Sequence, residues 1–320
     1  MALPSPSSVP QLKLNGHDCV RSSLQLLQLR RTSKHRTPAQ QQSRQLPRTR
    51  AAGGDDSLLR FLASSKASRM QHLEEQALGA LSHAADNYSN VVFPCALITG
   101  DVVILDLLSR LGYLHSGRVP VIFIDTFHLF PETHSFLHSL EAKYKFEAHT
   151  YKPQGFETKK DYQAKHGSDL YISNVDEYDR ICKVEPFQRS LKELETDVML
   201  NGRRRDHGAE RAHLEVFEAG KPLKCNPLAY WEFRDCWDYV HANKLEYHPL
   251  HDQGFPSIGD VQSTVPVPKE KWFEYAGERS GRFQNMTNPD GSAKTECGIH
   301  VMSDATTEAG PAAELVSAPP

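Results

Sequence analysis

The 320-residue sequence lacks three features that would each indicate a class of protein: a long hydrophobic run, a surplus of basic charge and closely spaced cysteine pairs. No stretch reaches the roughly 20 consecutive apolar residues that a membrane-spanning helix needs, so we expect a protein that does not cross a membrane. The formal net charge of −3 supplies no basic field for nucleic acid, which is therefore an unexpected partner. An anion site in this chain must be built from a few placed arginines and lysines.

The cysteines are few and scattered. They are Cys19, Cys95, Cys182, Cys225, Cys236 and Cys297. A chain of this length does not need disulfides for stability, so the pattern indicates a reducing compartment. We expect Cys95, Cys225 and Cys236 to be small buried apolar side chains. Only Cys297 has neighbours that suggest chemistry.

Residues 1–54 form a basic leader with nine lysines and arginines and a single acid, Asp18. Ser- and Arg-rich, acid-poor composition is typical of organelle transit peptides, and the abundance of Ser, Pro and Gln favours the plastid over the mitochondrion. A disordered basic arm is the alternative. We therefore expect a mature domain at 55–302 in the chloroplast stroma, followed by a disordered tail at 303–320.

Strand and helix patterns alternate in the middle of the chain. Apolar strand-like runs at 91–98, 119–124, 146–151 and 197–200 are separated by helical periodicity at 102–111, 131–145 and 184–194. This order predicts an α/β fold: a doubly wound, mostly parallel sheet with helices on both faces. Beyond residue 247 the many prolines and glycines predict a loop-rich C-terminal arm.

Ligands of doubly wound sheets bind at the carboxyl ends of the strands, so the loops at those ends hold the candidate site residues. The loop at 95–101 leads into a helix whose first N–H groups could hold an anion, although a single glycine makes it a weak phosphate loop. The next loop begins with Asp125 and Thr126, and its alternative interpretation is a plain strand-to-helix turn with Pro131 at the first helical position.

A cluster of arginines follows the last of these strands. It consists of Arg203, Arg204, Arg205 and Arg211. Guanidinium groups suit phosphate and sulfate oxygens, and the position directly after a buried strand favours an oxyanion site over a solvated charge run. Near the end of the chain, Arg279 and Arg282 precede Cys297 and His300. Neighbouring cations lower the pKa of a thiol and favour the reactive thiolate, although a lone cysteine near a histidine more often has no catalytic role.

Residues 91–300 resemble the sulfonucleotide reductase family, whose members act on adenylylsulfate (APS) or phosphoadenylylsulfate (PAPS) in sulfate assimilation and cysteine biosynthesis. The similar segments, in the family's order, are Ile-Asp-Thr at 124–126, Leu-Phe-Pro-Glu-Thr at 129–133, Lys-Val-Glu-Pro at 183–186, Gly202 with Arg204, Arg205 and Asp206, Arg211, Tyr-His-Pro-Leu at 247–250 with Asp252 and Gly254, Ser-Ile-Gly at 257–259, Arg279 with Arg282, and Glu-Cys-Gly-Ile-His at 296–300.

The resemblance implies an adenine-nucleotide α-hydrolase-like fold, with a nucleotide across the carboxyl end of the sheet and a mobile arm that delivers Cys297. It implies that Cys297 attacks sulfur with His300 nearby, and that an external thioredoxin or glutaredoxin then releases sulfite from S-sulfocysteine. The substrate-binding residues it implies are Lys183, Arg204, Arg205, Arg211, Arg279, Arg282, Asp125 and Thr126. The small-molecule substrate is then APS or PAPS.

The sequence also departs from the family pattern. Members with an iron–sulfur cluster carry cysteines where this chain has Tyr178, Asp179, Asp260 and Ser263, so we expect neither a cluster nor another bound metal. The chain ends shortly after residue 300 without a thioredoxin-like domain, which implies an external dithiol donor. The loop at 98–101 (Ile-Thr-Gly-Asp) differs from the family's Gly-Ala-Glu-Asp type.

Several functional alternatives remain open at this point. The plastid-type leader favours APS as the preferred substrate, whereas the missing cluster is similar to members that use PAPS. An adenylyltransferase of the ATP-pyrophosphatase fold would need a Ser-Gly-Gly-x-Asp-Ser loop, which is absent. A nucleotide-binding protein without catalysis would have no reason to carry the cysteine motif. A homodimer is compatible with the sequence.

Overall fold

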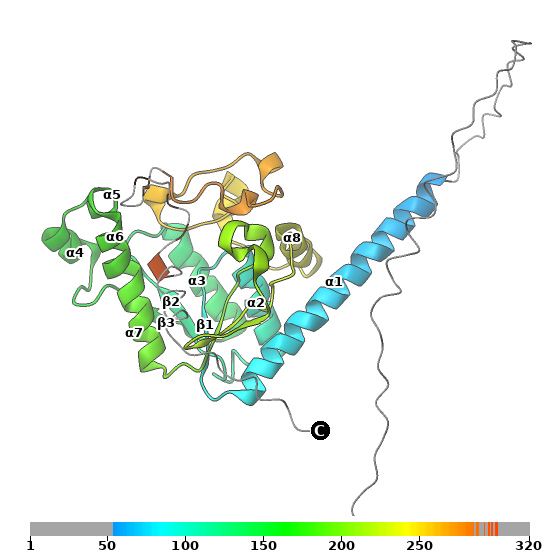
Figure 1. The fold of residues 1–320 in the computed structure, drawn as a ribbon, viewed down its shortest axis with the longest axis horizontal. Helices are drawn as coiled ribbons and strands as arrows, with labels where there is room; N and C mark the ends of the chain where they lie inside the picture. The colour runs from blue at the N-terminus through cyan, green and yellow to red at the C-terminus, as the bar shows by residue number, and fades with distance from the viewer. Residues whose placement is uncertain are drawn as a thin grey trace, which may run out of the picture. The chain divides into compact units, whose positions relative to one another are not determined.

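Strands and helices alternate along the chain as the sequence predicts (Figure 1). The computed structural model describes residues 54–284 together with 286, 287, 291, 294, 296, 298 and 299. The strands are β1 (Val91–Pro94), β2 (Val121–Ile124), β3 (His149–Tyr151), β4 (Val198–Leu200), β5 (Phe217–Glu218) and β6 (Leu223–Cys225). The α-helices are α1 (Gly54–Asn87), α2 (Thr99–Arg110), α3 (Pro131–Tyr144), α4 (Lys159–His166), α5 (Leu170–Ser173), α6 (Val175–Asp179), α7 (Glu185–Glu193) and α8 (Phe233–Ala242).

The strands form a mostly parallel sheet in the order β3-β2-β1-β4-β6-β5. Only β5, at one edge, runs antiparallel to its neighbour. The chain builds outward from β1 through β2 to β3, then returns to place β4 on the other side of β1. The order of the strands therefore reverses between β1 and β4. This reversal leaves a crevice at the carboxyl ends of these two strands.

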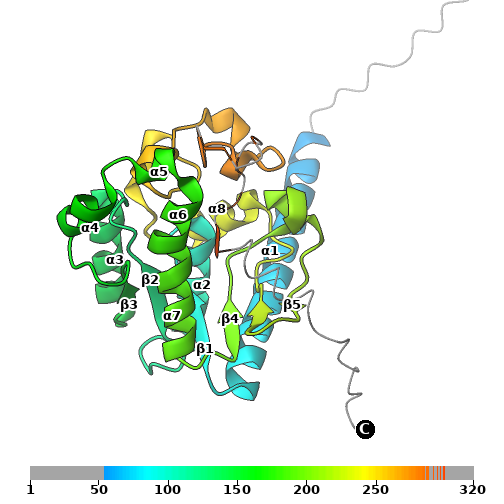
Figure 2. The ribbon, with the colours of Figure 1, turned by 60° about the vertical axis from the view of Figure 1, so that its left-hand side comes forward.

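Successive residues of the central strands face opposite sides of the sheet. Val91 and Phe93 pack into the main core, together with α1, α2, α3 and α8. Val92 and Ile122 belong to a smaller cluster that includes Leu191 of α7. Helices therefore cover both faces (Figure 2), which explains why the central strands are apolar throughout rather than alternating. The doubly wound fold predicted from the sequence is confirmed.

Two details differ from the sequence-based prediction, and the long first helix is buried only in part. Strands β5 and β6 are too short to leave a recognisable pattern. The helix predicted at 184–194 is preceded by a π-helical turn at Arg180–Val184. Pro186 explains this turn, since it has no N–H to donate and the regular helical ladder is interrupted just before it. In α1, only residues from Leu73 onward are buried, and the apolar side chains of its first two turns, such as Phe61, are exposed.

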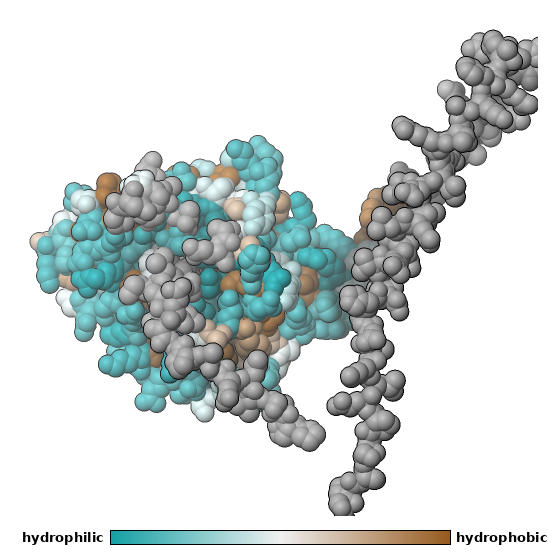
Figure 3. Space-filling model, in the orientation of Figure 1, coloured by the Kyte–Doolittle hydropathy of each residue, from teal (hydrophilic) through white to brown (hydrophobic). Residues whose placement is uncertain are grey.

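Beyond residue 247 the described chain is dominated by loops and short 3-10 helices, as predicted. These helices are Pro249–Gln253, Val261–Ser263, Lys269–Lys271 and Gly277–Arg279. Two further 3-10 helices, Arg205–His207 and Ala209–His213, follow β4. The face seen in Figure 3 is mostly hydrophilic, with hydrophobic side chains in small groups. Within the described residues no helix is long and apolar enough to cross a membrane. The expected leader and tail, apart from Gly54, fall outside those residues.

Candidate active site

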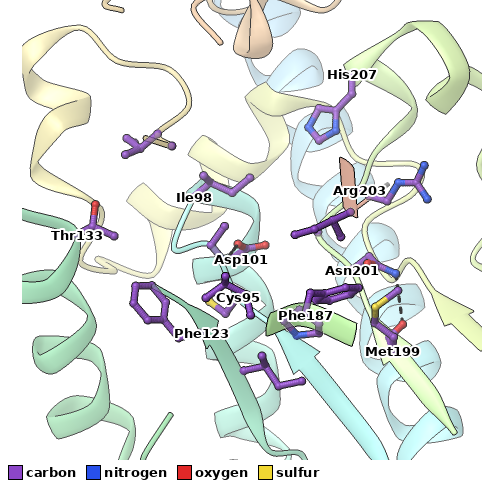
Figure 4. A pocket seen from close by; sticks show the side chains of 18 of the residues that line it. Cys95, Ile98, Asp101, Phe123, Thr133, Phe187, Met199, Asn201, Arg203 and His207 are labelled. Carbon is purple, nitrogen blue, oxygen red and sulfur yellow. Dashed lines mark hydrogen bonds between the residues drawn. The ribbon is translucent and has the colours of Figure 1, made fainter. Parts of the chain in front are cut away.

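A pocket of about 200 Å³ opens at the carboxyl ends of β1, β2 and β4, where the strand order reverses. Its lining includes Pro94 and Ile124, the last residues of β1 and β2, and Met199 of β4. This is the position at which doubly wound sheets bind their ligands. The loop after β1 and the loop after β4 form its sides (Figure 4).

The two sides of the pocket differ in chemistry. The lining includes the apolar side chains of Phe123, Leu129 and Ile258 and the nitrogen-bearing side chains of Arg203 and His207. Figure 4 shows Phe123 and Arg203 on opposite sides of the opening. Such a pocket suits a ligand with an apolar ring at one end and anionic groups at the other.

Two further arginines of the pocket, Arg211 and Arg279, meet at one carboxylate oxygen. Their guanidinium groups donate to Glu296 Oε2 over 2.7 Å and 3.0 Å. A carboxylate oxygen carries the same charge and hydrogen-bonding capacity as a sulfate or phosphate oxygen. The arrangement therefore demonstrates that these arginines can hold an oxyanion between them.

A buried ion network supports this cationic side from behind. Arg204 is fully buried and pairs with Glu278 and, over 3.0 Å, with Asp206. Glu278 also accepts a hydrogen bond from His207 Nε2 at 2.9 Å, and His207 Nδ1 accepts one from Arg211 at 2.9 Å. Burial alone would raise the pKa of Glu278, but Arg204 and His207 more than offset this effect, and the pKa lies well below its ordinary value. The network thus fixes the orientation of Arg211.

A second network joins Lys183 and Thr126. The Lys183 ammonium lies 2.9 Å from Asp179 Oδ1 and 2.9 Å from Asp260 Oδ2, and Thr126 donates to the other oxygen of Asp260 at 2.6 Å. Burial opposes ionisation of Asp260, yet Lys183 and the hydrogen bonds lower its pKa to about 2. Lys294 adds a second cation, 3.2 Å from Asp179. Lys183 is therefore held by carboxylates behind the pocket wall.

The residues flanking position 297 are attached to these networks. The Gly298 N–H donates to Asp179 Oδ2 at 2.9 Å, and Ile299 forms part of the pocket wall. A Cβ at position 298 would lie 2.9 Å from Val184 Cγ2, so glycine permits this close approach. Cys297 and His300 themselves lie outside the described residues. The described part of the predicted cysteine motif thus meets the pocket.

The structure separates the arginines that the sequence grouped together. Arg205 turns away from the pocket, where it binds the Leu214 carbonyl at 2.6 Å and stacks over Tyr230. Arg282 donates to Ser257 Oγ at 3.1 Å and to the Ile258 carbonyl at 2.9 Å.

Of the predicted substrate-binding arginines, only Arg211 and Arg279 line the pocket directly. Asp125 caps its own loop by accepting from the Phe127 N–H at 2.9 Å. The assignment of these residues to substrate binding stays a prediction.

The sequence placed Arg203 in the arginine cluster but not among the substrate-binding residues, and it did not single out His207; both residues line the pocket. The chain after β4 is extended, with Arg204 at φ −136° and ψ 156°, so neighbouring side chains point to opposite sides. That alternation directs Arg203 to the pocket and Arg204 to the core. Gly202 allows its backbone to lie close to Asp101, because a Cβ at position 202 would lie 2.4 Å from Asp101 Oδ1. Among the described residues, no group of three or more His, Cys, Asp or Glu side chains is arranged to hold a metal ion.

Three buried histidines around the pocket make stability depend on pH. Burial lowers the pKa of His248 and of His251 to about 4, and burial together with Arg204 lowers that of His207 to about 3. The unfolded rings take up protons near pH 6.5, so the unfolded state binds more protons below that pH. Stability is therefore full above pH 6.5 and is lost as the pH falls towards 4. Asp101 has the opposite effect on stability, because burial raises its pKa to about 7 and the folded state then binds one proton that the unfolded state does not bind near pH 5.

We expect a net difference of about two protons near pH 5, which corresponds to roughly 2.7 kcal/mol of unfolding free energy lost per pH unit. Urea unfolding at pH 7, 6 and 5 measures this slope. A free energy of unfolding that stays constant or rises between pH 6 and 5 would contradict the assignment of neutral buried rings.

The fold and pocket together define an α/β protein with a nucleotide-type site at the switch point of its sheet, apolar at one end and cationic at the other. Comparison with known proteins agrees with this class. The family model described as the phosphoadenosine phosphosulfate reductase domain matches residues 90–266. The chain therefore belongs to this family.

Individual relatives support the same assignment. The chain is 42% identical over 206 residues to a phosphoadenosine phosphosulfate reductase of Emericella nidulans. The aligned residues cover 63% of this chain and 63% of that protein. It is 39% identical over 213 residues to the Saccharomyces cerevisiae protein of the same description, covering 64% of this chain and 77% of that one. The crystal structure of phosphoadenylyl-sulfate reductase from Candida auris, a phosphate complex, matches with 36% identity and a TM-score of 0.54, covering 61% of this chain and 96% of that one.

Proposed function

We propose that this protein reduces a sulfonucleotide to sulfite, with PAPS as the preferred substrate. The observation that carries the proposal is the pair Arg211 and Arg279, which hold a carboxylate oxygen at the cationic side of a nucleotide-type pocket. The carboxylate belongs to Glu296, the residue immediately before the predicted nucleophile. An oxyanion bound by the same arginines would lie next to the cysteine motif.

The proposed reaction runs in three steps. The Cys297 thiolate attacks the sulfur of the sulfonucleotide, the bond between sulfur and the bridging oxygen breaks, and the nucleotide leaves with that oxygen. A thiolate of an external dithiol protein then attacks Sγ of the S-sulfocysteine, the bond from Sγ to the sulfo group breaks, sulfite leaves, and a mixed disulfide forms. The second thiolate of the donor attacks the donor sulfur of this mixed disulfide, which releases the Cys297 thiolate and leaves the donor oxidised to a disulfide. The arginines neutralise the charge on the two anions as the thiolate approaches.

The relatives favour the 3′-phosphorylated substrate over the unphosphorylated one that the leader suggested. The Emericella, Saccharomyces and Candida proteins are all named for phosphoadenosine phosphosulfate. An external thioredoxin or glutaredoxin as electron donor, the absence of an iron–sulfur cluster, a plastid location and a homodimer are further parts of the proposal.

Side-by-side kinetics with PAPS and APS test the proposal. We expect kcat/KM for PAPS to exceed that for APS by more than about tenfold, or roughly 1.4 kcal/mol of transition-state discrimination, because the 3′-phosphate adds an anion for the cationic side of the pocket. Sulfite released with a dithiol donor is the readout. A preference for APS would restore the substrate that the leader suggests. Release from neither nucleotide would leave a binding protein without catalysis.

A further inference from the structure

Two buried histidines hold the first turns of the helices that follow β1 and β2. His251 Nε2 lies 3.1 Å from Thr99 Oγ1 at the start of α2, and His248 Nε2 lies 3.0 Å from Thr133 Oγ1 at the start of α3. All four side chains are buried. The two pairs have similar geometry, but the histidine donates the hydrogen bond in one pair and accepts it in the other.

In the His248–Thr133 pair the histidine is the donor. His248 Nδ1 accepts a hydrogen bond from the Leu250 N–H at 3.3 Å, so this nitrogen carries no proton. Burial lowers the pKa of His248 to about 4, and the neutral ring must then carry its single proton on Nε2. Nε2 therefore donates to Thr133 Oγ1, and the hydroxyl proton of Thr133 is left to donate elsewhere.

In the His251–Thr99 pair the histidine is the acceptor. His251 Nδ1 lies 2.7 Å from the Phe255 carbonyl, which can only accept, so the ring proton is on Nδ1. His251 Nε2 is then a lone-pair acceptor, and Thr99 donates its hydroxyl proton to it. The proton of Thr99 is thus committed to the protein, in contrast to that of Thr133.

The side chain that carries this uncommitted hydroxyl lines the pocket. Figure 4 shows it on the same side of the opening as Phe123 and across from Arg203. Within the described residues its only hydrogen bond through Oγ1 is the one to His248. The arginines on the opposite side attract the anionic groups of a ligand, so an anion is not the expected partner of this hydroxyl. A ring nitrogen with a lone pair is a suitable acceptor for it.

We propose that Thr133 donates a hydrogen bond to an acceptor nitrogen of the nucleotide base and so contributes to base recognition. This inference rests on the proposed function, because it assumes that an adenine nucleotide occupies the pocket. His248 is a positioning residue in this arrangement: it fixes the Thr133 hydroxyl as a donor. Thr133 acts on binding of the base and not on the chemical step.

Binding of AMP and of its 1-deaza, 3-deaza and 7-deaza analogues by calorimetry tests the proposal. Each analogue lacks one ring nitrogen, and one of them should bind the wild-type protein about 3- to 10-fold more weakly than AMP, as the loss of one hydrogen bond predicts. Thr133→Val keeps the shape and removes the donor. It should bind AMP more weakly by a similar factor and no longer distinguish AMP from that analogue, whereas Thr133→Ser should retain the discrimination.

Thr99→Val is the matched control, since it also removes a threonine hydroxyl bonded to a buried histidine. Because the Thr99 proton is donated to His251, this variant should change the affinities of all four nucleotides by the same factor. The proposal is overturned if wild type binds all three analogues as tightly as AMP, or if Thr133→Val keeps the discrimination. A wild-type protein that binds no adenine nucleotide would instead overturn the proposed function.

Discussion

A Cys297→Ser variant is expected to release sulfite at least ~1,000-fold more slowly than wild type, a loss of roughly 4 kcal/mol of transition-state stabilisation. A serine hydroxyl is almost wholly protonated at neutral pH, and it lacks the nucleophilicity of a thiolate. The variant should still bind nucleotide, since Arg211 and Arg279 in the pocket wall are unchanged. Sulfite release with a dithiol donor and nucleotide binding by calorimetry together separate the two effects.

Cys225→Ala provides the matched control for this experiment. Cys225 is buried in β6, away from the pocket lining, and burial raises the pKa of its thiol to about 12. It therefore carries no thiolate at neutral pH, and its removal should leave sulfite release within a few-fold of wild type.

Labelled substrate without a dithiol donor should leave one sulfo group on the peptide that contains Cys297. Label on Cys95, which also lines the pocket but whose thiol pKa is raised by burial, would contradict the assignment of Cys297 as nucleophile.

The parts of the fold that could be predicted are those with a periodic signal. The runs that became β1 and β2 are apolar throughout because helices cover both faces of the sheet, and that continuity is visible in the sequence. The edge strand β5 has two residues, Phe217–Glu218, and its position depends on pairing with β6, which no local pattern records. Short strands of this kind are determined by tertiary contacts.

The candidate site could be located from the sequence, but the hydrogen bonds and ion pairs within it could not be predicted. The arginine run after β4 indicated an anion site, and Arg211 does line the pocket. Which of the adjacent arginines faces the ligand depends on the backbone direction at Arg204 and on a carboxylate, Glu278, that is 74 residues further along the chain. Sequence motifs identify such residues as a group, and only their partners in space assign each one to the core, the pocket or the surface.

Replacing Glu278 by glutamine is expected to lower the free energy of unfolding by about 3 kcal/mol at pH 7. Glu278 is the buried carboxylate that pairs with the fully buried Arg204 and accepts from His207. Glutamine keeps the size of the side chain but removes its charge, so among the described residues Asp206 is left as the carboxylate that pairs with the Arg204 guanidinium. Breaking a buried pair in this way is far more costly than never having formed it.

Glu215→Gln is the matched control for the Glu278 variant, and urea unfolding of both at pH 7 measures the difference. Glu215 pairs with Arg205 at 2.7 Å, but its side chain is 62% exposed, so its loss should cost less than about 1 kcal/mol. Because the pKa of Glu278 is lowered in the folded state, its contribution is present above the ordinary glutamate pKa of 4.5 and is lost as the pH falls below it. The deficit of Glu278→Gln should therefore be complete at pH 7 and shrink below pH 4.5. Equal losses of unfolding free energy for the two variants would mean that the buried carboxylate contributes no more to stability than an exposed one. That result would contradict the role of the Glu278 network in fixing Arg211.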